Sequence, residues 1–182
     1  MKKNIFSVLV FLIPIVSYSQ RSIEFTLGAG VTIIDIEKLV LLDENIGSEA
    51  LDWETTSFGI SGQYFISTSE NIAFGGELMY QSLYWYSVRV PYVPNPIYRD
   101  YSISTVRITP IIRMGGANAF NFDLGPEFNF SDGLSIGVLA SANYNIAISD
   151  KIDIPLKLRL DIMNQIVTTI PVSINVGVRI KM

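Results

Sequence analysis

The chain has 182 residues, with 17 acidic and 13 basic side chains, a formal net charge of −4 and a mean hydropathy of +0.36. It contains no cysteine and no histidine, which excludes a disulfide framework, a thiolate metal site, a cysteine nucleophile and the commonest general base. The acidic balance also argues against nucleic-acid binding, and we expect neither a cofactor nor catalysis.

Residues 1–19 predict a signal peptide. Lys2 and Lys3 are followed by an apolar stretch at residues 5–16 that is too short to span a bilayer, and Ser17-Tyr18-Ser19 has the small-x-small form of a cleavage site. The exported domain would then be residues 20–182. The alternative is a buried N-terminal segment.

Beyond this segment, apolar and polar residues alternate with a period of two, as in strands with one apolar face. The third candidate strand is the least regular, because Met79, Leu83 and Trp85 share a face with Glu77 and Gln81. The eight candidate strands cover residues 22–34, 57–68, 72–90, 101–114, 119–130, 134–148, 152–162 and 169–182.

The connections suggest an orientation. The links after the second, fourth and sixth strands are short, whereas residues 35–56 and 91–100 form long links. Outer-membrane barrels have short periplasmic turns and longer outer loops. The pattern therefore predicts an all-β fold, an eight-stranded antiparallel up-and-down transmembrane β-barrel with both ends in the periplasm, located in the outer membrane of a Gram-negative bacterium.

Side-chain volume decides which face points outward. A soluble barrel of the lipocalin kind would place the apolar face inside. Eight strands enclose an interior just wide enough for side chains or one small ligand, and the apolar face here is rich in Phe, Tyr, Leu and Ile. The other face is rich in Gly, Ser, Thr and Asn and fits the interior better, so we expect the apolar face to contact lipid. Gly28 and Gly30 would relieve crowding inside.

The predicted interior carries balanced charge. Charges in a confined space must be paired or hydrated. The charged residues could therefore form a structural, salt-bridged plug that fills the lumen, or they could line a narrow path for ions or protons. The predicted lumen charge cluster contains Glu24, Glu77, Arg107, Arg113, Asp123, Glu127, Lys157, Arg159 and Arg179, with Asp153, Asp161 and Lys181 on the same face.

Two segments resemble a known family. Residues 101–113 run from Tyr101 through an alternating strand to Pro110-Ile111-Ile112, and Phe122 to Phe128 has the form aromatic-x-x-Gly-Pro-x-aromatic. Both are similar to segments of the PorT-like outer-membrane β-barrel family of Bacteroidetes. The end of the predicted signal peptide, Ser-Tyr-Ser-Gln, resembles the signal endings of exported proteins from that group. The resemblance implies an OmpA/OmpX-type eight-stranded fold and carries no activity. The chain departs from many barrels by ending in Met182 instead of an aromatic residue that the assembly machinery reads.

Two links hold candidate binding features. Trp85, Tyr92 and Tyr98 flank a Pro-rich link, where they form either an interfacial aromatic girdle or a protruding hairpin that binds a partner. The acidic first link, residues 35–56, lacks regular calcium-ligand spacing and is more simply a solvated loop.

These features predict a non-catalytic envelope protein with a structural or surface-contact role. The alternatives are an accessory component of a secretion or transport assembly, and a small pore. The expected partners are outer-membrane lipid, the outer-membrane assembly machinery and a surface or secretion-system protein, with no nucleic acid.

If the aromatic link binds a partner, replacing Trp85, Tyr92 and Tyr98 with Ala should abolish that binding, because stacked rings supply the contact. The heat-modifiable gel mobility of the folded barrel should not change. Crosslinking from the long links to envelope proteins measures the binding, and unchanged crosslinking would reject the hypothesis.

Overall fold

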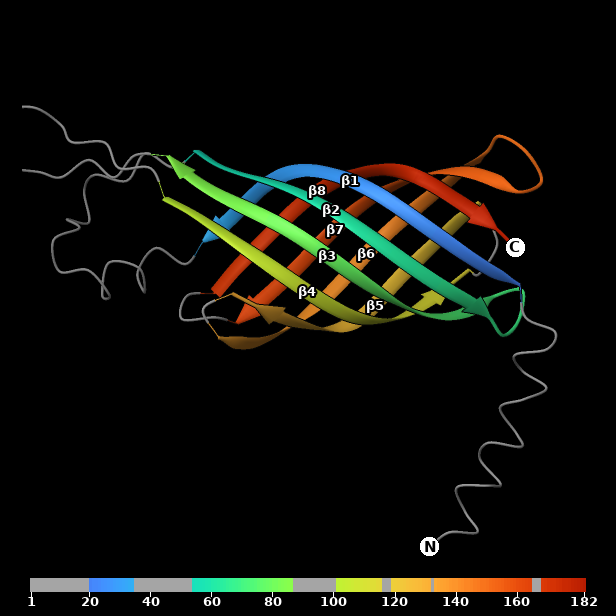
Figure 1. The fold of residues 1–182 in the computed structure, drawn as a ribbon, viewed down its shortest axis with the longest axis horizontal. Helices are drawn as coiled ribbons and strands as arrows, with labels where there is room; N and C mark the ends of the chain where they lie inside the picture. Colours follow the sequence, from blue (N-terminus) through green and yellow to red (C-terminus); the bar gives the residue numbers. More distant parts are fainter. Residues whose placement is uncertain (1–19, 35–53, 87–100, 116–118, 132, 165–167) are drawn as a thin grey trace, which may run out of the picture.

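A computed structural model describes residues 20–34, 54–86, 101–115, 119–131, 133–164 and 168–182. These residues form eight antiparallel strands, each hydrogen-bonded to the next, with β1 also paired to β8, so the sheet closes into a barrel (Figure 1). Within these ranges, no helix is long and apolar enough to cross a bilayer. The strands are β1 (Arg21–Ile34), β2 (Glu54–Ser67), β3 (Ile72–Tyr86), β4 (Tyr101–Met114), β5 (Phe120–Phe130), β6 (Leu134–Ala147), β7 (Ile152–Asn164) and β8 (Thr168–Lys181).

The period-two pattern produces two different faces. In β5, Phe120, Phe122 and Leu124 are about half exposed on the outside, whereas Asn121 and Asp123 are buried in the interior. The same alternation runs around the barrel, because a strand sends successive side chains to opposite faces. The predicted eight-stranded antiparallel fold is therefore confirmed.

Some strand limits differ from the predicted ones. The second strand begins at Glu54, so residues 54–56 belong to the sheet and not to the first link. The third strand ends at Tyr86 in the described part of the chain, and residues 87–90, predicted as its continuation, lie outside that part. With 15 residues against 13 or 14 for most others, β3 is not unusually long over its described range.

The irregular alternation of the third strand has a structural explanation. Met79 and Leu83 point into the interior together with Glu77 and Gln81, so the strand alternates normally and only its inward side chains are mixed. Phe65, Ala73, Ile111 and Leu139 likewise form an apolar cluster inside the barrel. The interior is thus a mixed core of charged, polar and apolar groups, not a uniformly polar one.

Both ends of the described chain lie at the same end of the barrel (Figure 1). The Met182 N–H donates a hydrogen bond of 2.8 Å to the Arg21 carbonyl, and the Ser67 N–H donates one of 2.8 Å to the Gln20 carbonyl. The turns after β2 and β6 and the end of β4 lie at this same end, because every second strand of an up-and-down barrel returns to it. We call this end the terminal mouth.

The ladder between β4 and β5 is interrupted in the middle of the wall. Pairing is in one constant register from Val106↔Phe130 to Ile108↔Phe128 and again from Ile112↔Leu124, which places Pro110 opposite Pro126 in the gap. Neither proline has an N–H to donate. Loss of pairing over three positions is the expected result when both members of one hydrogen-bonded pair are proline.

Replacing Pro110 and Pro126 together with Val should therefore restore two backbone hydrogen bonds and stabilise the β4–β5 ladder by about 1 kcal/mol per bond. Amide hydrogen exchange in detergent micelles should slow for Ile112 and Leu124, which flank the gap. The matched control is Ile112→Val, which changes a neighbouring outward side chain but adds no donor. Exchange rates that are equal in the double variant and the wild type would contradict this explanation of the gap.

Candidate functional site: the charged lumen

The inward positions of the strands bring together every charged residue that the sequence placed in the lumen. Eleven of these side chains are buried, and Lys181, the twelfth, is 31% exposed at the terminal mouth. All twelve take part in ion pairs. The six acids are Glu24, Glu77, Asp123, Glu127, Asp153 and Asp161, and the six cations are Arg107, Arg113, Lys157, Arg159, Arg179 and Lys181.

A central cluster lies in the middle of the barrel and consists of Glu77, Glu127, Asp161, Arg107 and Arg159. Arg107 Nη1 lies 3.0 Å from both Glu127 Oε1 and Asp161 Oδ2. Arg159 Nη1 lies 2.5 Å from Glu77 Oε2, and its Nε donates to Asp161 at 2.8 Å. Three carboxylates therefore share two guanidinium groups, none of them more than slightly exposed.

A mouth cluster lies closer to the chain ends and consists of Glu24, Asp123, Asp153, Arg113, Lys157, Arg179 and Lys181. Arg113 forms a bidentate pair with Asp123 at 2.6 and 2.8 Å and also pairs with Glu24. Lys157 Nζ lies 2.5 Å from Glu24 Oε2. Here four cations face three carboxylates, the opposite imbalance to that of the central cluster.

A neutral side chain joins the two clusters. Gln63 Nε2 donates a hydrogen bond of 2.7 Å to Glu77 Oε1, and Lys157 Nζ donates to Gln63 Oε1. Gln81 similarly accepts a hydrogen bond from Arg107. Neither glutamine belongs to the predicted lumen charge cluster, although both occupy the inward register that the period-two pattern defines.

The ion pairs reach across the lumen. Arg159 on β7 contacts Glu77 on β3, and these strands are four positions apart in a ring of eight, so they lie on opposite walls. Arg113 on β4 contacts Glu24 on β1, three strands away. Side chains from opposite walls meet at ion-pair distance, which fills the interior, as expected for eight strands.

Packing in the lumen also depends on glycine. A methyl group built on Gly28 would overlap the side-chain oxygen of Asn175, and one on Gly30 would overlap the Val172 carbonyl. These glycines leave room for the Asn175 side chain and the backbone of the neighbouring β8, as their position in an alternating strand predicted.

The outer wall is a continuous apolar surface. Leu78, Leu158 and Ile174 are 58%, 57% and 69% exposed. In β8 the outward apolar residues run from Ile170 to Ile180, ten residue steps or roughly 34 Å along a strand. With a typical tilt of about 40° this corresponds to an apolar band of roughly 26 Å, close to the ~25 Å band of outer-membrane barrels.

The predicted partner-binding residues are mostly not described. Trp85 lies in β3, where its backbone pairs with Thr55 and Tyr101. Tyr92, Tyr98 and the acidic stretch at residues 35–53 lie outside the described residues. In the parts that the structure covers, no group of three acidic side chains is arranged to hold a metal ion.

Two solved structures share this architecture. OprG, an outer-membrane protein from Pseudomonas aeruginosa, superposes with a TM-score of 0.52 at 10% identity over 90% of this chain and 96% of its own. Neisserial surface protein A superposes with a TM-score of 0.50 at 12% identity over 89% of this chain and 97% of its own. The chain has the fold of the eight-stranded outer-membrane β-barrels. Identities this low establish a shared fold and nothing about a shared activity.

At the level of sequence, the chain matches no protein-family model and no curated protein. Its resemblance to the PorT-like family therefore stays a prediction. The OmpA/OmpX-type fold that the resemblance implied is the one observed.

Arg159 should be essential for the stability of this outer-membrane-type barrel, because it contacts three carboxylates. Replacing it with Met leaves Glu77, Glu127 and Asp161 with one guanidinium, and breaking a buried pair costs about 3–5 kcal/mol. Urea unfolding in lipid vesicles measures the loss. Lys151→Met, in an exposed turn, should change stability by less than about 0.5 kcal/mol.

A second variant distinguishes charge from packing. Adding Glu77→Gln to Arg159→Met removes one of the unpaired acids, so it should recover part of the lost stability. An Arg159→Met barrel that unfolds at the wild-type urea concentration would show that the network does not stabilise the fold.

Proposed function

We propose that the chain is a non-catalytic outer-membrane β-barrel of a Gram-negative bacterium, with a filled and salt-bridged lumen and a structural or surface-contact role in the envelope. The observation that carries the proposal is the division of side chains between the two faces of one closed wall. Among the described residues, large apolar groups cover the outside and the six ion-paired acids lie inside.

This division suits hydrocarbon and not water. A water-soluble barrel buries its apolar face, whereas here that face is about half exposed all around the wall. A closed sheet leaves no open edge, so backbone polar groups are paired within the wall even where lipid surrounds it. The height of the apolar band agrees with a bilayer crossing.

The lumen supports the structural role over a pore. Ion pairs such as Arg159–Glu77 and Arg107–Asp161 span the interior, and apolar Leu139 and Met163 occupy other inward positions. Every lumen carboxylate contacts at least one cation, which suits a stiffening plug better than acid–base catalysis.

We further propose that any partner contact uses the long links that follow β1 and β3. These links hold the aromatic residues Tyr92 and Tyr98, next to the β3 residue Trp85. Tyr and Trp combine a large apolar area with a polar group, which suits both an interfacial girdle and a protein or glycan contact. An accessory place in a secretion assembly would use the same surface.

Refolding of residues 20–182 tests the proposal. The polypeptide should require detergent or lipid, insert into vesicles, and show heat-modifiable gel mobility, since burying its outer wall needs an apolar solvent. Leu158→Arg, on the outer wall, should cost about 2–4 kcal/mol of stability in vesicles if it lies near the midplane. Exposed Ile148→Arg, beside the turn into β7, should cost about 0–1 kcal/mol as the matched control.

A freely water-soluble, monomeric product would reject the membrane location. Ion conductance across a planar bilayer that contains the same preparation distinguishes a filled lumen from a pore. We expect no steady conductance, and a reproducible open-channel conductance would favour the pore.

A further inference from the structure

The two charge clusters are not separately neutral. The central cluster has three carboxylates and two guanidinium groups, and the mouth cluster has four cations and three carboxylates. The lumen as a whole is balanced, but positive charge is displaced toward the terminal mouth. An excess cation near water is available to an anion from solution.

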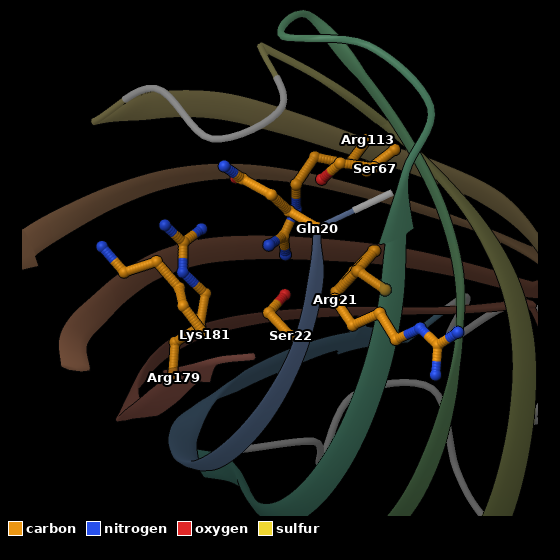
Figure 2. A pocket seen from close by; sticks show the side chains of 9 residues that line it. Gln20, Arg21, Ser22, Ser67, Arg113, Arg179 and Lys181 are labelled. Carbon is orange, nitrogen blue, oxygen red and sulfur yellow. The ribbon is translucent and has the colours of Figure 1, made fainter. Parts of the chain in front are cut away.

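A hollow at this mouth is lined by basic residues and by no acid. Its charged lining residues are Arg21, Arg113, Arg179 and Lys181, accompanied by hydroxyl groups of Ser22 and Ser67 and the amide of Gln20 (Figure 2). The carboxylates that pair with these cations are absent from the lining. Phe65 and Ala73 complete the lining. The charged groups that line the hollow are therefore all hydrogen-bond donors, although part of its lining is apolar.

The basic groups are held in place before any ligand arrives. Arg113 is fixed by its bidentate pair with Asp123 and by stacking 3.7 Å above the centre of the Phe65 ring. Arg179 Nε donates to Asp153 at 2.9 Å, and Lys181 Nζ lies 2.9 Å from the same carboxylate. Preorganised donors lose little conformational entropy on binding.

Donor capacity remains after these pairs are counted. The Nη1 atom of Arg179 lies 3.9 Å from Glu24 Oε1, and this distance is too long for a hydrogen bond. A Lys ammonium carries three N–H groups, so the contact of Lys181 with Asp153 leaves others for a ligand. In Figure 2, Arg179 and Lys181 stand on one side of the hollow and Ser67 on the other, while Arg21 is turned away from them.

We propose that this hollow, defined by Ser22, Ser67, Arg179 and Lys181, binds one compact oxyanion, a carboxylate or phosphate group that reaches the terminal mouth from water. Guanidinium and ammonium groups form their strongest hydrogen bonds with such oxygens. Two sources share this chemistry: the terminal carboxylate of a peptide and the phosphate of a lipid headgroup. That the hollow opens to the periplasm rests on the proposed function, whereas its lining and its chemistry do not depend on it.

Chemical-shift titration of the isotope-labelled barrel in zwitterionic micelles tests the site. Inorganic phosphate and N-acetyl-Ala-Ala should cause saturable shifts of the Ser22, Ser67 and Lys181 amides, whereas the C-terminal amide of the same dipeptide and chloride at equal ionic strength should not. A response to N-acetyl-Ala-Ala stronger than that to short-chain phosphatidic acid assigns the peptide source, and the reverse order assigns the lipid source.

Lys181→Gln should weaken phosphate binding about tenfold, the loss of one hydrogen bond to a charged group. Lys151→Gln removes the same charge from a nearby exposed turn that does not line the hollow, and it should leave the affinity unchanged. Ser22→Ala provides a variant that keeps every charge and should weaken binding less.

Equal losses for the two lysine variants, shifts that chloride reproduces, or no saturation would each overturn the site. A barrel that inserts into vesicles but fails this titration refutes the anion site alone. A chain that stays water-soluble refutes the proposed function instead.

Discussion

Pairing of charge inside a narrow closed wall is the constraint on which the rest of this structure depends. Charged groups removed from water are costly unless a partner compensates them, and a wall facing hydrocarbon offers no place for them outside. The barrel places six acids and six cations on its inner face, where Arg159 and Glu77 meet from opposite strands. Pairs such as Arg159–Glu77 and Arg113–Glu24 therefore depend on the register of strands that are distant in the sequence.

This constraint explains features that look unrelated. Gly28 in β1 makes room for the Asn175 side chain of the neighbouring β8, and the neutral Gln63 links Lys157 to Glu77. Apolar residues fill other inward positions. The prolines of β4 and β5 face outward and interrupt one stretch of ladder while the wall remains closed. The interior is filled by cross-lumen contacts, as expected for a barrel of eight strands.

The distribution of charge along the barrel has a separate consequence. The twelve lumen charges are balanced overall, but the central cluster has more carboxylates than cations and the mouth cluster has more cations than carboxylates. Charge that is uncompensated locally matters most where it meets water, since solvent ions and ligands reach it there. The basic residues of the mouth thus take part in ion pairs of the lumen and also line the hollow at that end of the barrel.

The sequence by itself determined the number of strands, the division of most side chains between two faces and the identity of the lumen charges, because the alternation of side chains has a period of two wherever a strand forms. Only the tertiary structure decided which charges pair, since the partners of Arg159 lie on β3, β5 and β7 and depend on barrel closure and stagger. It also decided that Met79 and Leu83 are inward core residues, that Gln63 links two clusters, and that basic groups line the mouth. Local pattern specifies orientation, whereas contacts across a lumen require the geometry of the closed sheet.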